Sequence, residues 1–153
     1  MKEKVVTLLN KARSAELGAI AQYMIHHYEL EDQDFGKLAT KLKETAIVEM
    51  KHAEKLAERI LFLGGVPTSK PDVEPQKGQA IPEVLTTDEA LERKAVAMYN
   101  EAAVLCGDFR DQKSRDLFEE LVADEENHLS LFENIKGHIE KLGASYLATL
   151  VGK

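Results

Sequence analysis

The sequence predicts an all-α protein: an antiparallel four-helix bundle with one long crossover and a short fifth helix at the C-terminal end. Apolar residues recur three and four positions apart over four long segments. Three of the 4 prolines (Pro67, Pro71 and Pro75) fall in one short stretch, which leaves the remaining chain free to run in helices. The two halves of the chain also echo each other at an offset of 76 residues, as two copies of one helical hairpin would.

Each element has its own start or stop signal. The first helix is expected over about residues 4–31 and the second over about 34–63, where Gly64-Gly65-Val66-Pro67 ends it. A polar connection runs to about residue 81. The third helix should cover about 82–106, with Pro82 in its first turn, and the fourth about 111–142, with Gly143 in the stop position. A short helix at about 145–151 completes a single domain over residues 1–153.

Composition narrows the function. A chain of 153 residues with 44% hydrophobic and 31% charged residues suits one soluble domain with a real core. A net charge of −7 argues against nucleic acid or anionic membrane as the main partner and favours small cations. The one cysteine, Cys106, cannot form an internal disulfide. With no secretory signal pattern and no long apolar span, a cytoplasmic protein is expected.

The internal repeat carries two chemical motifs. The segment Glu16–Tyr23 echoes Glu92–Tyr99, and Glu49-Met-Lys-His52 echoes Glu125-Glu-Asn-His128. In each half, the two glutamates that begin these motifs are 33 positions apart, and the midpoints fall at the two expected turns. Residues equally far from the turn of an antiparallel hairpin lie at the same height. Glu16 should therefore face Glu49, and Glu92 should face Glu125.

Each Glu-x-x-His pair points to one face of its helix, and that face is the apolar stripe. Four buried, unpaired carboxylates are very costly, whereas two divalent ions would neutralise their −4 charge. Carboxylate oxygens with one imidazole per ion suit iron or manganese. Solvated helix-face charges are the alternative for one such motif, but two motifs in register favour a metal site. The predicted ligands are Glu16, Glu49, His52, Glu92, Glu125 and His128.

The pattern resembles the ferritin-like di-iron carboxylate proteins and, within them, the bacterioferritins. That family carries Glu-Leu-x-Ala-Ile-x-Gln-Tyr, matched by Glu16–Tyr23, and Glu-Met-Lys-His-Ala, matched by Glu49–Ala53. Its Glu-Arg-Ile-Leu-Phe-Leu-x-Gly-x-Pro stands here as Glu58–Pro67, and its Asp-Glu-Glu-x-His as Asp124–His128. The resemblance covers nearly the whole chain and weakens in the crossover and after Tyr99.

The resemblance implies a ferroxidase that oxidises Fe(II) with oxygen or peroxide, for iron storage and detoxification. Glu49 and Glu125 would bridge the two ions, completed by Glu16 with His52 and by Glu92 with His128. It also implies a ferric mineral inside a 24-subunit shell of dimers, and a ferredoxin-type electron donor. The chain has no tryptophan, so electron steps assigned to tryptophan in that family do not transfer. Inner-surface iron-binding residues of some members are not recognisable either.

Met50 matches the methionine that binds haem b in bacterioferritins, where each of two subunits supplies one; the resemblance therefore implies the same role for Met50. Helical spacing turns Met50 toward the flank of the bundle, in a strip with Ala46, Ala53 and Ala57. The alternative is a methionine that fills a gap at a helix interface.

Tyr23 and Tyr99 each follow a ligand glutamate by two helical turns. Tyr23 is predicted to be a catalytic residue, either as a hydrogen-bond donor to a carboxylate or as an electron donor. The alternative is a tyrosine of the core whose hydroxyl has another partner. Asp124 could orient a ligand imidazole or lie on the surface. Three other histidines lack paired spacing and are expected on surfaces or packing seams: His26, His27 and His138.

Other protein classes fit less well. Rubrerythrin-type peroxidases usually carry a Cys-x-x-Cys module, which a single cysteine excludes. Eukaryotic-type ferritins lack the second symmetrical Glu-x-x-His, so His128 argues against them. A haem-binding or structural bundle that stores metal without rapid oxidation stays open at this point.

Overall fold

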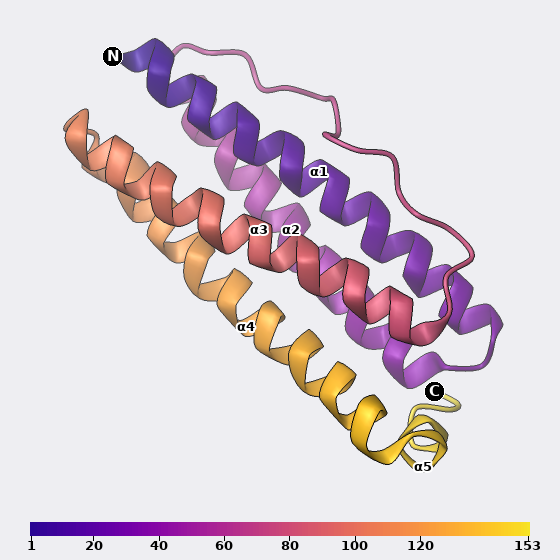
Figure 1. The fold of residues 1–153 in the computed structure, drawn as a ribbon. Helices are drawn as coiled ribbons and strands as arrows, with labels where there is room; N and C mark the ends of the chain where they lie inside the picture. Colours follow the sequence, from indigo (N-terminus) through magenta and orange to yellow (C-terminus); the bar gives the residue numbers. More distant parts are fainter.

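The computed structural model describes all 153 residues and contains five helices. They are α1 (Lys2–Asp32), α2 (Gly36–Phe62), α3 (Ile81–Asp108), α4 (Gln112–Leu142) and α5 (Ala144–Ala148). The four long helices lie side by side in an elongated bundle, and α5 packs at one end (Figure 1). The predicted all-α bundle is confirmed, with helix ends only a few residues from those expected. None of the helices combines the length and apolar character needed to cross a membrane.

The two hairpin turns share one backbone geometry. Asp34 and Arg110, which are equivalent in the 76-residue repeat, both adopt left-handed conformations, with φ of 65° and 61°. The N–H of Phe35 bonds to the carbonyl of Leu30 at 2.9 Å, and the equivalent bond closes the second turn at the same distance. These bonds satisfy carbonyls that the helix end leaves free. The repeat seen in the sequence therefore extends to the backbone.

The start of α4 is fixed by a cap that also ties the hairpins together. The Asp111 side chain accepts a hydrogen bond from the Ser114 N–H at 3.0 Å, which satisfies one free donor of the first turn. Arg59 of α2 donates to the same carboxylate at 2.7 Å. At the far end Gly143, with φ of 57°, ends α4 as its sequence position predicts.

A polar layer across the middle of the bundle divides the apolar core in two. One cluster lies toward the end that carries α5 and the other toward the N-terminus. The first is built around Tyr23, Leu38, Leu42, Leu85 and Phe132, and the second around Leu9, Leu56, Tyr99, Phe118 and Leu121. The two clusters hold the four helices on both sides of the layer, so the polar residues between them are fixed in place.

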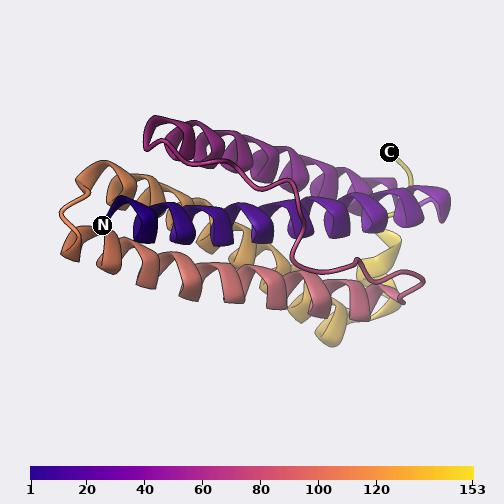
Figure 2. The ribbon, with the colours of Figure 1, turned by 90° about the horizontal axis from the view of Figure 1, so that it is seen from above.

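The crossover between α2 and α3 passes over the outer face of α1 and crosses this helix on its way to α3 (Figure 2). Side chains of α1 bind its backbone: Asn10 bonds to Val66 and Thr68, and Ser14 donates to the Lys70 carbonyl at 2.7 Å. Farther along, the Gln22 amide oxygen accepts from the backbone N–H of residue 76 at 2.7 Å. These bonds hold an irregular, Pro-bearing segment against one helix over most of its length.

Candidate metal centre

The polar layer is made of the six predicted ligands. Glu16 comes from α1, Glu49 and His52 from α2, Glu92 from α3, and Glu125 and His128 from α4. They form two overlapping groups: Glu16, Glu49, His52 and Glu125, and Glu49, Glu92, Glu125 and His128. Within each group the ligand atoms all lie within 4.8 Å of one another. Glu49 and Glu125 belong to both groups, which is the arrangement that two bridging carboxylates require.

These side chains are buried and lack protein partners for several of their polar atoms. Each of the four glutamates is 1% exposed, and His52 is 2% exposed. Eight buried side-chain nitrogen and oxygen atoms in the whole chain have no hydrogen-bond partner, and seven of them belong to the six residues. Buried polar atoms are nearly always paired in folded proteins. The unpaired oxygens and imidazole nitrogens therefore fit a pair of divalent cations.

Both imidazoles turn the same nitrogen toward the carboxylates. Nδ1 of His52 lies 3.5 Å from carboxylate oxygens of Glu16 and Glu49. Nδ1 of His128 lies 3.2 Å from oxygens of Glu49 and Glu125. Each histidine thus faces the two shared carboxylates, Glu49 and Glu125, and one carboxylate of its own group, which is Glu16 for His52 and Glu92 for His128. The layer therefore offers one imidazole to each of two ions.

The pKa values in the layer show how strongly it favours positive charge. Burial raises the pKa of Glu92 to about 8, although its contact with His128 acts in the opposite direction. Burial also raises the pKa of Glu16, and burial together with repulsion from Glu16 raises that of Glu49. Burial opposes charge on His128, but its contacts with Glu125 and Glu92 raise its pKa to about 10. Protons and cations therefore compete for the same sites.

Asp124 orients one of the two imidazoles. Its carboxylate lies 2.8 Å from Nε2 of His52. A carboxylate only accepts, so Nε2 carries the proton and Nδ1 of a neutral ring presents its lone pair to the carboxylate layer. At the position equivalent to Asp124 in the repeat, α2 carries Val48. His128 has no such partner and is 12% exposed, so the two halves of the layer differ here.

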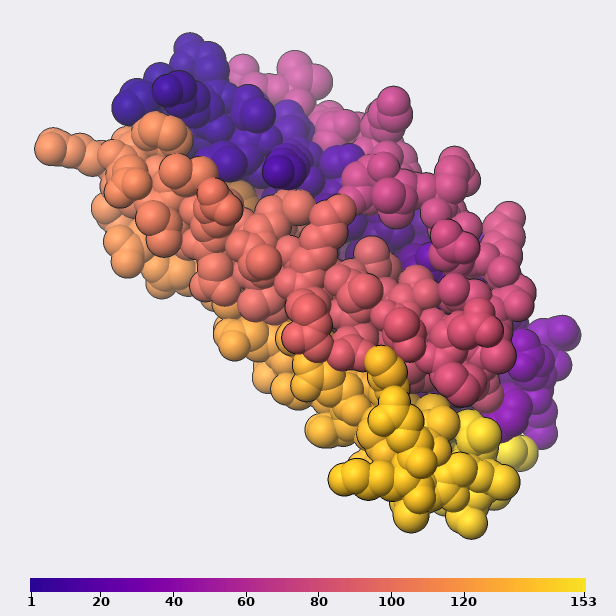
Figure 3. Space-filling view, viewed as in Figure 1, coloured from indigo at the N-terminus to yellow at the C-terminus, as the bar shows by residue number.

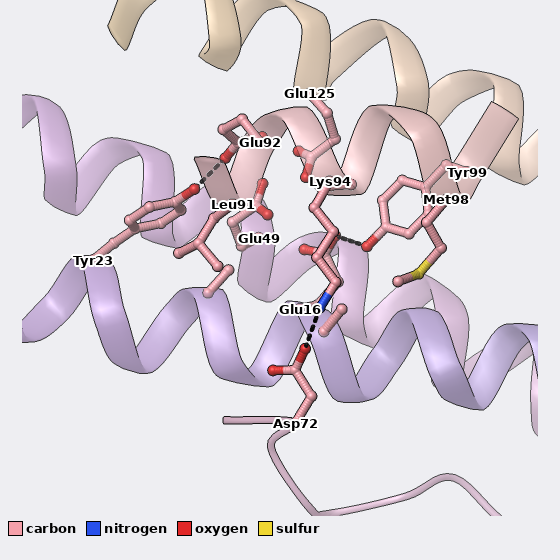
Figure 4. Close-up of a pocket in the computed structure, with 13 residues that line it drawn as sticks. Glu16, Tyr23, Glu49, Asp72, Leu91, Glu92, Lys94, Met98, Tyr99 and Glu125 are labelled. Atoms are coloured by element: carbon pink, nitrogen blue, oxygen red, sulfur yellow. Dashed lines mark hydrogen bonds and ion pairs between the residues drawn. The ribbon is translucent and has the colours of Figure 1, made fainter. Parts of the chain in front are cut away.

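The two tyrosines donate hydrogen bonds across the bundle (Figure 4). The phenol of Tyr23 on α1 donates to Glu92 on α3, and that of Tyr99 on α3 donates to Glu16 on α1. Burial raises the pKa of both phenols, which keeps them protonated as donors. Spacing placed both tyrosines near the site, but it did not show that each one contacts the glutamate of the opposite hairpin.

A buried histidine–aspartate pair beside the centre was missed from sequence. Nδ1 of His26 lies 2.9 Å from the carboxylate of Asp88, and neither side chain is exposed. Burial raises the pKa of Asp88 to about 6, against the opposing effect of His26. His26 was expected on a surface or packing seam, and it lies on the seam between α1 and α3. Its place one turn after Tyr23, on the buried face, was the available signal.

Met50 lies on the outside of the bundle and does not reach the metal layer. It is 42% exposed, and Ile47, one turn earlier, is 40% exposed. The exposed strip of alanines expected around Met50 is not formed as the sequence suggested, because two of its three alanines are buried. Ala46 is fully buried in the core and Ala53 is 5% exposed, because both are turned toward neighbouring helices.

Comparison with known proteins agrees with this geometry. The ferritin-like domain family matches residues 6–142. The bacterioferritin of Desulfovibrio desulfuricans is 44% identical over 151 residues, covering 99% of this chain and 84% of the relative. That of Brucella melitensis is 40% identical, covering 92% of this chain and 87% of the relative. The chain belongs to the bacterioferritins, within the ferritin family.

A solved structure gives the same result for the fold of this bacterioferritin. The X-ray structure of the D. desulfuricans bacterioferritin matches with a TM-score of 0.97 at 43% identity, covering 99% of this chain and 89% of that one. That protein has a di-iron site, which was studied in different catalytic states. The family match over residues 6–142 includes all six residues of the metal layer.

Proposed function

We propose that this bacterioferritin is a ferroxidase that stores and detoxifies iron. It binds two Fe(II) ions per chain, oxidises them to Fe(III), and passes the ferric iron to a mineral. The observation that carries the proposal is the pair of overlapping four-residue groups that share Glu49 and Glu125. A site for a single ion would need only one such group.

The charges and the electrons both balance at two ions. Four carboxylates contribute −4 and two Fe(II) ions +4, so the loaded layer is neutral inside a buried site. Oxidation of two Fe(II) ions releases two electrons. With two protons, these electrons reduce one O₂ to H₂O₂, or one H₂O₂ to two H₂O. Because both electrons come from one site, the oxidant is reduced without a free one-electron intermediate.

The residues divide into three roles in this proposal. Glu49 and Glu125 hold both ions, since each faces both histidines. Glu16 with His52, and Glu92 with His128, complete one ion each. Tyr23 and Tyr99 hold the terminal carboxylates through their phenols. Asp124 holds His52 in the tautomer that a metal needs.

Titration with Fe(II) under air tests the function. The fast rise in ferric absorbance should end at two ions per chain. Glu49→Ala removes a shared ligand and one buried charge, so the variant should fold but lose the fast phase of iron oxidation. Glu54→Ala, an exposed change on the same helix, is the control. Iron binding with no fast ferric absorbance in the unaltered protein would instead indicate a storage bundle without ferroxidase activity.

A second proposal is that haem b binds between two copies of the chain, held by one Met50 from each. The exposed thioether of Met50 fits this role, because it is free to meet a partner outside its own core. Neutral, soft thioether ligands favour ferrous haem. The haem, when bound, would supply one-electron transfer for release of stored iron. A ferredoxin-type protein is the proposed electron donor.

We also propose a 24-subunit shell of dimers in the cytoplasm. Several large apolar side chains are exposed on the helices, and contact with other copies of the chain would bury them. They include Tyr28 at 60%, Leu61 at 61%, Phe62 at 77% and Val104 at 64% exposure. Sedimentation should give twenty-four times the mass of one chain, and a stable monomer or dimer would contradict the shell.

A further inference from the structure

A narrow cavity connects the metal layer to the face of the bundle that carries the crossover. It lies between α1 and α3 and has a volume of about 20 Å³, room for one water molecule or one ion. Oxygen-bearing side chains of the metal layer form its inner end: Glu16, Glu49, Glu92 and Glu125. Asp72 from the crossover and Lys94 from α3 line the same cavity. It is therefore a path from the carboxylates toward that face.

An ion pair stands over the outer end of this cavity. Nζ of Lys94 lies 3.9 Å from the carboxylate of Asp72, and the two side chains are 62% and 26% exposed. Figure 4 shows the Lys94 side chain running from α3 past Glu16 toward the carboxylate of Asp72. Exposed pairs at such a separation contribute little stability, so this one can open at small cost.

The backbone and a glycine hold Asp72 at that place. Its N–H donates to the Ser14 carbonyl of α1 at 3.1 Å. A Cβ atom at Gly18 would lie 2.1 Å from Oδ1 of Asp72, so only glycine leaves room for the carboxylate on α1. Gly18 and Lys94 are equivalent positions in the 76-residue repeat. The repeat therefore puts these two positions on the facing helices α1 and α3. Gly18 leaves room for the Asp72 carboxylate, and Lys94 supplies its positive partner.

We infer that Asp72 and Lys94 form a charge gate for metal ions that reach the centre between α1 and α3. The inference rests on the proposed function, because it concerns how Fe(II) arrives. The carboxylate of Asp72 receives the incoming cation in exchange for the Lys94 ammonium, and the cavity leads from there to the glutamates. Figure 3 looks onto this face, where the crossover and α3 flank α1.

Co(II), which binds without being oxidised by air in this assay, tests the gate by stopped-flow absorbance. Lys94→Met removes the charge but keeps the length, and should speed Co(II) binding about three- to tenfold at low ionic strength. Asp72→Asn should slow binding by a similar factor, and Gly18→Ala should do the same because its Cβ displaces Asp72. These differences should shrink at high salt, which screens exposed charges. The final amplitude, two ions per chain, should not change.

Arg93→Met is the matched control. Arg93 neighbours Lys94 on α3 and is 60% exposed, so its replacement by methionine also removes one exposed positive charge. Arg93 pairs with Glu89 and Glu133, however, and not with a residue of the cavity. Equal rates for Lys94→Met and Arg93→Met would overturn the gate, as would Asp72→Asn at the unaltered rate. In both cases a normal amplitude of Co(II) binding, equal to two ions per chain, would still support the metal centre. Absence of Co(II) binding in the unaltered protein would overturn the metal centre and the gate together.

Discussion

The carboxylate of Asp124 on α4 accepts a hydrogen bond from Nε2 of His52 on α2, at 2.8 Å. The position equivalent to Asp124 in the 76-residue repeat is Val48, whose side chain cannot accept a hydrogen bond. The two halves of the metal layer have the same ligand types, but only the imidazole of His52 is held by a carboxylate outside the layer. This inequality should be visible in the affinities of the two ions.

Replacement of Asp124 by alanine should weaken the ion beside His52. Loss of such an orienting partner typically costs about ten- to a hundredfold in metal affinity. The ion beside His128 should change much less. Anaerobic titration with Fe(II) measures both affinities, with Glu126→Ala as the control, since it removes an exposed charge on the same helix. Equal weakening of both ions would contradict the assigned role.

Tyr23→Phe should lower metal affinity through Glu92. The hydrogen bond from Tyr23 lowers the pKa of Glu92, so its loss makes the proton on Glu92 harder for a metal to displace. We expect an affinity loss of roughly tenfold or less, with oxidation at saturating iron slowed no more than in Tyr99→Phe. Unchanged affinity with slower oxidation in Tyr23→Phe alone would assign electron donation to Tyr23 instead.

The metal-free protein should become less stable as pH rises from about 6.5 to about 8.5. Burial raises the pKa of Glu92 to about 8. Burial opposes charge on His52, but its hydrogen bond to Glu16 and attraction to the carboxylates raise its pKa to about 9. The folded chain thus holds more protons than the unfolded chain in this window, so the free energy of unfolding falls with pH.

Thermal unfolding at the two pH values measures this effect. Metal affinity should change in the opposite direction and rise with pH, because bound metal displaces those protons. A melting temperature of the metal-free protein that rose across this window would show that the carboxylates are not protonated as the burial requires.

Met50→Leu should remove haem and leave iron oxidation largely intact. The change keeps the side-chain volume and loses the sulfur ligand. Protein expressed with ample haem should show a Soret band equivalent to one haem per two chains. Met24→Leu is the control, since Met24 packs against the core of its own chain. No Soret band in the unaltered protein, or a normal one in Met50→Leu, would contradict the haem proposal.

Helical periodicity and the 33-residue spacing were enough to predict the fold class and to bring six residues to one height. Those signals depend on regular geometry, in which a number of residues converts to a distance. The crossover has no such regularity. The position of Asp72 over Gly18 and Lys94 therefore could not be predicted, although each residue lies in a predicted element. The His26–Asp88 pair was missed because it joins helices of different hairpins.

The central claim is that six residues hold two metal ions in one layer. A crystal structure of the iron-loaded protein, with anomalous data at the iron edge, tests it most directly. We expect two anomalous peaks roughly 3.5–4 Å apart, both in contact with Glu49 and Glu125, with one histidine on each. A single peak between the helices, or peaks outside the layer with any two of the six side chains turned to solvent, would contradict it.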